Sequence, residues 1–148
     1  LSDVACALGL SQLNRIEHFI TQRNEIADFY DEFFEKTALF FPIKISHPLR
    51  SSRHLYPIIL DRSLWCAKEE LFEACIAAGI GVQVHYKPIY QNSYYIKKFG
   101  KMKLPNCEDF YRSVLAIPCH QGVSITQAKE IAKTLLEILK PYEKGCRF

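Results

Sequence analysis

One long amphipathic helix is the strongest constraint that this sequence places on its own fold. Across residues 14–36, apolar side chains recur every three or four positions, which is the period of an α-helix, and charged side chains occupy the opposite side. The apolar stripe is wide and rich in aromatic rings: Ile16, Phe19, Ile20, Ile26, Ala27, Tyr30, Phe33 and Phe34. Such a stripe must pack on another element, so we expect this helix to form one wall of a hydrophobic core.

Further helices are predicted elsewhere in the chain. Ser2 or Asp3 can cap a helix that runs to about Leu13. Residues 68–78 have a helical apolar pattern, and Ser124-Ile-Thr-Gln is a capping box that marks the start of a final helix. We therefore expect helices at both ends and in the middle of the chain.

The predicted strands are short and few. They cover residues 39–41, 54–60 and 114–118. Pro57 has no backbone N–H to donate, so the second of these strands is expected at a sheet edge or at a bulge. Because helices outnumber strands and alternate with them irregularly, the predicted fold class is α+β, with a short, mostly antiparallel sheet covered by helices and with long N-terminal helices.

Composition limits the classes of protein to which the chain can belong. A chain of 148 residues that is 49% hydrophobic can bury enough surface for one domain. Nineteen basic and sixteen acidic residues are spread along it, so a nucleic-acid partner is not indicated. The apolar run at residues 4–10 is too short to span a membrane and lacks preceding basic residues. Six irregularly spaced cysteines without a Cys-x-x-Cys pair favour reduced thiols in a cytoplasmic protein over a zinc site.

The segment at residues 82–90, Val-Gln-Val-His-Tyr-Lys-Pro-Ile-Tyr, concentrates the groups that could bind a ligand. It follows Gly79, where the helical pattern stops, and its alternation predicts a short strand. Val82 and Val84 would then face one side of the sheet, and Gln83 and His85 the other. Pro88 would end the pairing. The segment is predicted to present an amide, an imidazole and two phenols at a sheet edge.

Most other candidate chemistry is better explained by structure. A histidine on a strand, such as His85, is more often structural than functional, and His54 is expected to pack beside that strand. His120 follows Cys119 directly, but neighbouring side chains on an extended chain point apart, which disfavours a nucleophile–base pair. No metal-ligand spacing and no phosphate-binding glycine loop is present. Residue spacing alone therefore predicts no catalytic residue and no metal site.

Five segments in order resemble the C-terminal part of the DegT/StrS-type nucleotide-sugar aminotransferases: residues 1–13, 23–30, 54–58, 79–91 and 110–118. The stretch from residue 82 to residue 91 is the most specific, and the resemblance spans nearly the whole chain. It implies the small C-terminal domain of a fold type I enzyme that uses pyridoxal 5'-phosphate. Residues 1–36 would be helices that connect to and pack on a large domain, and residues 37–148 would form the small α/β domain.

For the whole protein, the resemblance implies transfer of an amino group from glutamate to C4 of a UDP-4-keto-6-deoxy-N-acetyl-hexosamine, in pseudaminic acid or other surface-glycan biosynthesis, by a cytoplasmic homodimer. The family's Schiff-base lysine and an Asn-x-Arg element that binds cofactor phosphate would lie upstream of Leu1. This chain alone is therefore expected to bind no cofactor and to be inactive. The substrate-binding residues carried over from the family are Gln83, Val84, His85 and Tyr86, with Tyr90 as an additional one.

Two other functions remain open on the sequence. The chain could be a stand-alone, non-catalytic binding or assembly domain that retains the fold. It could also be a cofactor-independent enzyme that uses His85 and the neighbouring tyrosines. A coding sequence upstream of Leu1 with the lysine region and Asn-x-Arg would favour the aminotransferase over the binding domain.

Overall fold

The computed structural model describes residues 2–43 and 50–142. Its helices are α1 (Asp3–Leu13), α2 (Ile16–Phe34), α3 (Lys68–Ala77), α4 (Ser93–Phe99), α5 (Pro105–Ser113) and α6 (Ile125–Leu139). Its strands are β1 (Phe40–Pro42), β2 (Tyr56–Leu60) and β3 (Val114–Ile117), and its 3-10 helices are η1 (Arg62–Ala67), η2 (Ile89–Gln91) and η3 (Lys140–Tyr142). This is the predicted α+β class.

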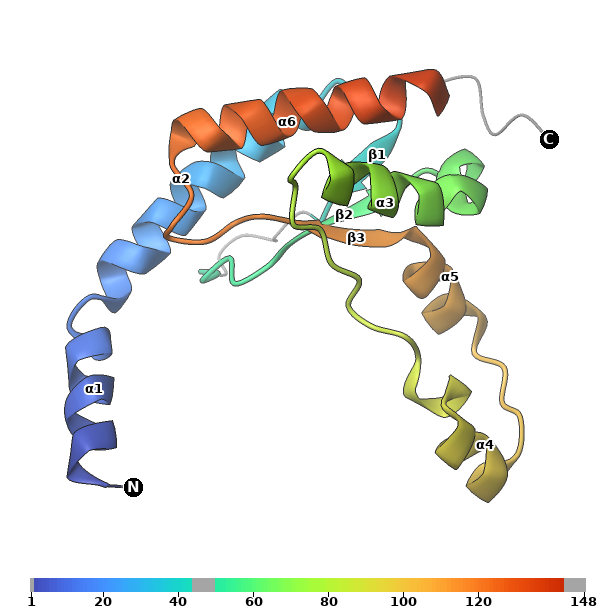
Figure 1. The fold of residues 1–148 in the computed structure, drawn as a ribbon, viewed down its shortest axis with the longest axis horizontal. Helices are drawn as coiled ribbons and strands as arrows, with labels where there is room; N and C mark the ends of the chain where they lie inside the picture. Colours follow the sequence, from blue (N-terminus) through green and yellow to red (C-terminus); the bar gives the residue numbers. More distant parts are fainter. Residues whose placement is uncertain (1, 44–49, 143–148) are drawn as a thin grey trace.

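A three-stranded antiparallel sheet in the order β1-β2-β3 lies at the centre of the fold. Helices α2, α3 and α6 lie on one side of it, α1 stands away from the sheet, and α4 lies at the end of a long excursion (Figure 1). The register pairs Ile58 with Leu115 and Tyr56 with Ile117, so these four side chains share the face that points toward the helices. The opposite face carries Pro57 and its partner Ala116, which are outside the main core cluster.

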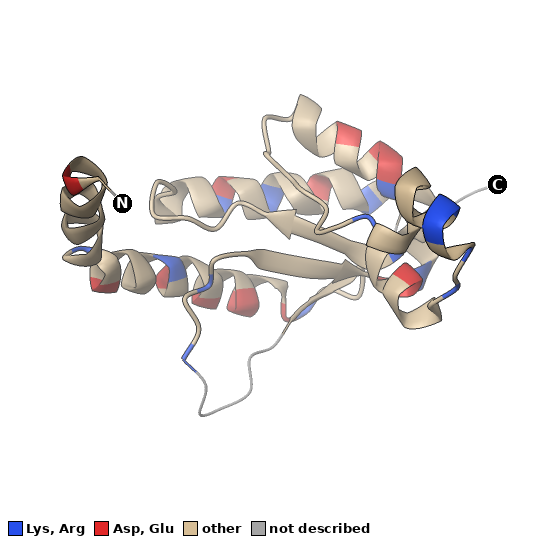
Figure 2. Ribbon diagram, turned by 90° about the horizontal axis from the view of Figure 1, so that it is seen from below, with Lys and Arg blue, Asp and Glu red and all other residues tan. Residues whose placement is uncertain are grey.

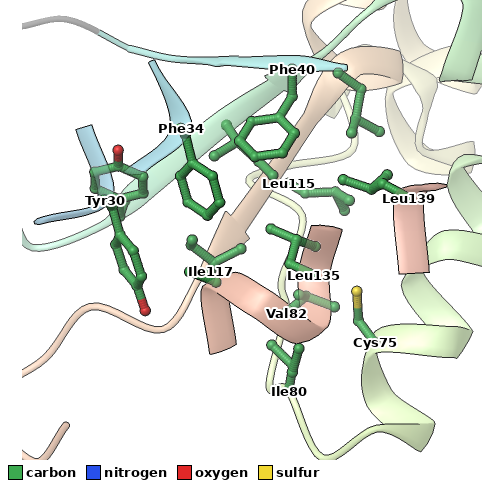
Figure 3. Packing of buried hydrophobic residues seen from close by; sticks show 14 of the residues in the cluster. Tyr30, Phe34, Phe40, Cys75, Ile80, Val82, Leu115, Ile117, Leu135 and Leu139 are labelled. Atoms are coloured by element: carbon green, nitrogen blue, oxygen red, sulfur yellow. The ribbon is translucent and has the colours of Figure 1, made fainter. Parts of the chain in front are cut away.

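The hydrophobic core forms between the helical layer and this sheet face. The aromatic stripe of α2 supplies Tyr30 and Phe34, whose rings lie 5.7 Å apart, and Phe34 meets Phe40 of β1 at 4.7 Å (Figure 3). From α6, Leu135 and Leu139 enter the same cluster. The prediction that the long helix forms a wall of the core is confirmed.

Local sequence signals explain where the helices begin and end. The Ser124 hydroxyl accepts the Gln127 N–H at 3.2 Å, and the Gln127 side chain accepts the Ser124 N–H at 2.9 Å, which is the predicted capping box. Helix α3 ends at Ala77, two residues before Gly79, whose φ is 78°. The Ile80 N–H bonds to the Cys75 carbonyl in a Schellman motif, so the chain leaves the helix toward residue 82 in a fixed direction.

Two strand predictions need correction. Pro57 is in β2, the central strand, so the expected edge position or bulge is wrong. Its carbonyl accepts the Ile43 N–H at 3.5 Å, and the proline nitrogen faces the same side, where β1 ends at Pro42. The missing donor therefore falls at the end of the β1–β2 ladder. The short strand expected between residue 82 and Pro88 is reduced to one isolated bridge, between Gln83 and Ala116.

Charges and thiols follow the sequence analysis with one exception. In the described part of the chain, the strands carry no charged residue, and residues of both signs are spread over the helices and connections (Figure 2). Cys6, Cys75, Cys107 and Cys119 are free thiols, as expected. Cys66 is disulfide-bonded, so the expectation of a reduced thiol is wrong there, because sequence spacing does not show which cysteines approach each other.

Within the described residues, no helix is both long and apolar enough to cross a bilayer.

Candidate functional site

A groove of about 460 Å³ lies beside the sheet face that the helical layer leaves free. Gln83 and His85 contribute side chains to it from the segment next to β3, and Ala116 forms part of its floor. Two further histidines, His54 and His120, line the same groove. The groove therefore brings together two of the predicted site residues, Gln83 and His85, whereas Tyr86 is not part of its lining.

Backbone pairing fixes the position of Gln83. Its N–H donates to the Ala116 carbonyl at 3.0 Å, and its carbonyl accepts the Ala116 N–H at 2.8 Å. Because residues that face each other across an antiparallel bridge point to the same side, Gln83 must share the free face with Ala116. Val82 on the opposite side is buried in the core. The predicted alternation is thus confirmed, although the strand is only one residue pair long.

His85, which lines the groove, has a ring nitrogen without a hydrogen-bond partner in the described part of the chain. The residue is half-buried, and its Nδ1 atom is buried without a hydrogen-bond partner among the described residues. The ring packs edge-to-face on Tyr86 at 4.8 Å, and the Tyr86 side chain is 74% exposed. A buried polar atom without a partner is costly unless something else bonds it. A polar ligand that reaches the His85 ring could supply that bond.

The structure does not bring Val84 and Tyr90 into this groove. The Val84 side chain lines a separate cavity on the opposite side of the segment. Tyr90 is buried, and its hydroxyl lies 3.3 Å from a Glu108 carboxylate oxygen and 3.5 Å from the Leu104 carbonyl. In this structure Tyr90 therefore ties η2 to the start of α5.

Sequence reasoning did not place His54 and His120 in the groove. His54 comes just before β2, and His120 follows just after β3. Because the two strands are antiparallel and Tyr56 pairs with Ile117, the residue before one and the residue after the other emerge at the same sheet end. His120 Nδ1 accepts the Gly122 N–H at 3.1 Å, which orients its ring. The sequence alone does not show that β2 and β3 pair, and this pairing is what brings His54 and His120 together.

The groove offers hydrogen-bonding groups but no amine. Its lining contains imidazoles, an amide and backbone, and no lysine among the described residues. The described residues also contain no group of three His, Cys, Asp or Glu side chains that could hold a metal ion. The arrangement can therefore bind and orient a polar ligand, but it cannot hold an aldehyde cofactor covalently.

Solved structures of sugar aminotransferases share this fold over nearly the whole chain. Helicobacter pylori PseC, described as an aminotransferase of pseudoaminic acid biosynthesis, superposes with a TM-score of 0.86 at 37% identity, over 91% of this chain and 36% of that one. The PMP form of a putative sugar aminotransferase from Streptococcus pneumoniae superposes with a TM-score of 0.89 at 26% identity, over 95% of this chain and 36% of that one.

The chain belongs to the DegT/DnrJ/EryC1/StrS aminotransferase family, whose sequence profile matches residues 1–136. A UDP-4-amino-4,6-dideoxy-N-acetyl-beta-L-altrosamine transaminase from Campylobacter jejuni is 53% identical, over 98% of this chain and 39% of that protein. The Helicobacter pylori transaminase of the same name is 36% identical, over 97% of this chain and 38% of that protein. The chain thus spans about two-fifths of the length of the curated relatives that it matches.

Proposed function

We propose that this chain is the C-terminal portion of a nucleotide-sugar aminotransferase and that the groove at Gln83 and His85 is one wall of its sugar-nucleotide site. The observation that carries the proposal is the unpaired Nδ1 atom of His85, a residue that lines the groove together with Gln83. The substrate class comes from the relatives, which are named as transaminases of a UDP-linked amino sugar. We infer a UDP-4-keto-6-deoxy-N-acetyl-hexosamine as acceptor and glutamate as donor.

The role of the wall is to position the substrate. The Gln83 amide can both donate and accept, and the His85 ring can bond one more polar atom at Nδ1. Together with the exposed Tyr86, whose ring contacts His85, these groups would hold the sugar hydroxyls and the N-acetyl group so that C4 points toward the reacting centre. Val84 would pack on the side of residues 82–86 that faces away from the groove, and Tyr90 would fix the position of η2 against α5. Both would therefore act on the substrate indirectly.

The residues of the groove do not fit the cofactor's covalent attachment, because no amine lines it. In this family pyridoxal phosphate supplies the electron sink and carries the amino group between donor and acceptor. The lysine that holds it would belong to the part of the enzyme that the relatives have beyond this chain. We therefore propose that the chain alone does not turn over and that the active form is a cytoplasmic homodimer of the longer protein.

The exposed side of α1 supports the proposal that residues 1–36 pack on a large domain. Helix α1 buries none of its residues within this structure. Four of its apolar side chains are at least 60% exposed: Val4, Leu8, Leu10 and Leu13. So many exposed large apolar residues on one short helix indicate a surface that another part of a protein covers.

Amino transfer by the full-length protein tests this function. We expect glutamate-dependent amination of a UDP-4-keto-6-deoxy-N-acetyl-hexosamine by the full-length protein reconstituted with pyridoxal phosphate, and none by this chain treated in the same way. Mass spectrometry of the sugar nucleotide reports the product. Amination by the chain alone would refute the proposal that the cofactor-binding lysine lies outside this chain. If the full-length protein binds the UDP-sugar without aminating it, the binding-domain alternative is favoured.

A further inference from the structure

A second cavity, of about 420 Å³, lies between η1, α3 and α5. Residues 82–86 separate it from the groove, because Val84 lines the cavity whereas Gln83 and His85 line the groove. Its principal walls are aromatic, aliphatic and basic side chains: Trp65, Lys68, Phe72, Val84, Tyr111 and Arg112. Its volume falls in the range of small-ligand sites, and its mix of apolar walls with a few polar groups is typical of them.

The Lys68 amine is the most unusual group in this cavity. It is half-buried, it donates a hydrogen bond to the Tyr111 carbonyl in the last turn of α5, and it lies 5.0 Å from the centre of the Tyr111 ring. Within the described residues, no carboxylate forms an ion pair with it. Burial without a counter-ion lowers the pKa of Lys68 from 10.5 to about 8. A substantial fraction of this amine is therefore neutral near physiological pH.

The other charged groups around the cavity include one suited to an anion. Arg112 lies on its wall with an exposed side chain, and its only described ion pair is a loose one of 3.8 Å to Asp109. Glu69 also lines the cavity and is exposed to solvent. Cys66 on the same wall is disulfide-bonded and does not titrate. Arg112 therefore offers a guanidinium that can exchange a weak surface partner for a phosphate.

We propose that Lys68 is a modification site, at which its amine takes the acyl group of a small acyl phosphate held in the cavity by Arg112. The Lys68 nitrogen attacks the acyl carbon and forms the N–C bond, the C–O bond to phosphate breaks, and phosphate leaves with that electron pair. The amine releases a proton to water, and no oxidant or reductant is needed.

The hydrogen bond to Tyr111 is compatible with this attack. A neutral amine can donate one N–H to the Tyr111 carbonyl and keep its lone pair directed toward the cavity. The amide product retains one N–H for the same carbonyl, so the link between α3 and α5 survives while the positive charge is lost. The acyl group would then lie against Val84, behind the wall that carries Gln83 and His85.

The test is site-resolved acetylation of the purified chain with acetyl phosphate, quantified for each lysine by peptide mass spectrometry. Lys129 and Lys133, which are exposed on α6, serve as internal controls. At pH 7.5 we expect Lys68 to react about tenfold faster than these controls, because its larger neutral fraction outweighs its lower basicity. Its rate should level off above about pH 8, where most of its amine is already neutral. Equal rates at Lys68 and the controls would overturn the proposal.

The Arg112→Gln variant tests the phosphate anchor separately. We expect it to slow acetylation of Lys68 by acetyl phosphate severalfold and to leave Lys129 and Lys133 unchanged. With acetic anhydride, which carries no phosphate, the variant and the parent chain should acetylate Lys68 at equal rates. An unchanged rate with acetyl phosphate would show that Arg112 does not hold the donor and would refute that part of the proposal.

Discussion

The Asp31 carboxylate joins α2 to the end of the sheet at which the groove lies, so removing it should loosen both. One of its oxygens accepts the Tyr56 hydroxyl at 2.6 Å, and the other pairs with the Arg53 guanidinium at 2.9 Å. Arg53 immediately precedes His54, which lines the groove. The pair is therefore one of the direct links between α2 and this end of the sheet.

The cost of Asp31→Ala follows from what the change leaves behind. The Arg53 side chain is 12% exposed and would lose its carboxylate, and breaking such a buried pair costs about 3–5 kcal/mol. The Tyr56 hydroxyl is buried and would lose its acceptor, which costs about 1–3 kcal/mol. Because the Asp31 side chain is itself 34% exposed, water can enter after its removal and partly replace both lost interactions, the ion pair with Arg53 and the hydrogen bond with Tyr56. We expect a total loss of about 2–4 kcal/mol in the free energy of unfolding.

Urea unfolding followed by circular dichroism measures this change. The matched control is Asp109→Ala, which removes an exposed, 3.8 Å pair with Arg112 and should cost less than about 1 kcal/mol. A double-mutant cycle of Asp31→Ala with Tyr56→Phe separates the hydroxyl contribution from that of Arg53. If Asp31→Ala costs no more than Asp109→Ala, the argument that this buried pair fixes the sheet end is refuted.

Three further predictions concern stability. Burial raises the pKa of Cys75 and of Cys119 from 9.0 to about 11, so the unfolded chain loses these protons at lower pH than the folded chain does. The free energy of unfolding should therefore fall between pH 9 and pH 11, by up to about 2–3 kcal/mol per thiol. Replacing both cysteines by alanine should flatten this part of the pH profile, and an unchanged slope would contradict the assignment. Tyr30→Phe removes a 3.1 Å hydrogen bond to the Pro118 carbonyl and should cost about 1 kcal/mol in urea unfolding, whereas no loss would show that water replaces it. Ser124→Ala removes the cap of α6 and should cost about 0.5–2 kcal/mol by the same measurement, with an unaltered midpoint as the contrary result.

Local signals made most of the fold predictable. The α1 bounds, the capping box of α6 and the stop at Gly79 depend on residues within one turn of each other, so the sequence shows them directly. The position of Pro57 depends on which strands pair, and that is set by contacts far apart in the chain. The edge prediction failed for this reason.

The candidate site was predictable only in part, because local alternation is visible in the sequence and strand pairing is not. The alternation of residues 82–85 correctly separated Gln83 and His85 from the valines. Beyond Pro88 the chain turns into η2, so Tyr90 points into the packing against α5 and not into the groove. The contributions of His54 and His120 required the antiparallel pairing of β2 and β3.

The most direct test of the account is the apparent KM for the UDP-4-keto-sugar in the full-length protein with His85→Ala or Tyr86→Phe. Lys133→Ala, on the exposed side of α6, is the control for expression and folding. Loss of one hydrogen bond to the substrate should raise KM about tenfold for His85→Ala. A smaller rise is expected for Tyr86→Phe, and none for the control. An unchanged KM in both site variants would contradict the claim that residues 83–86 form a wall of the sugar-nucleotide site.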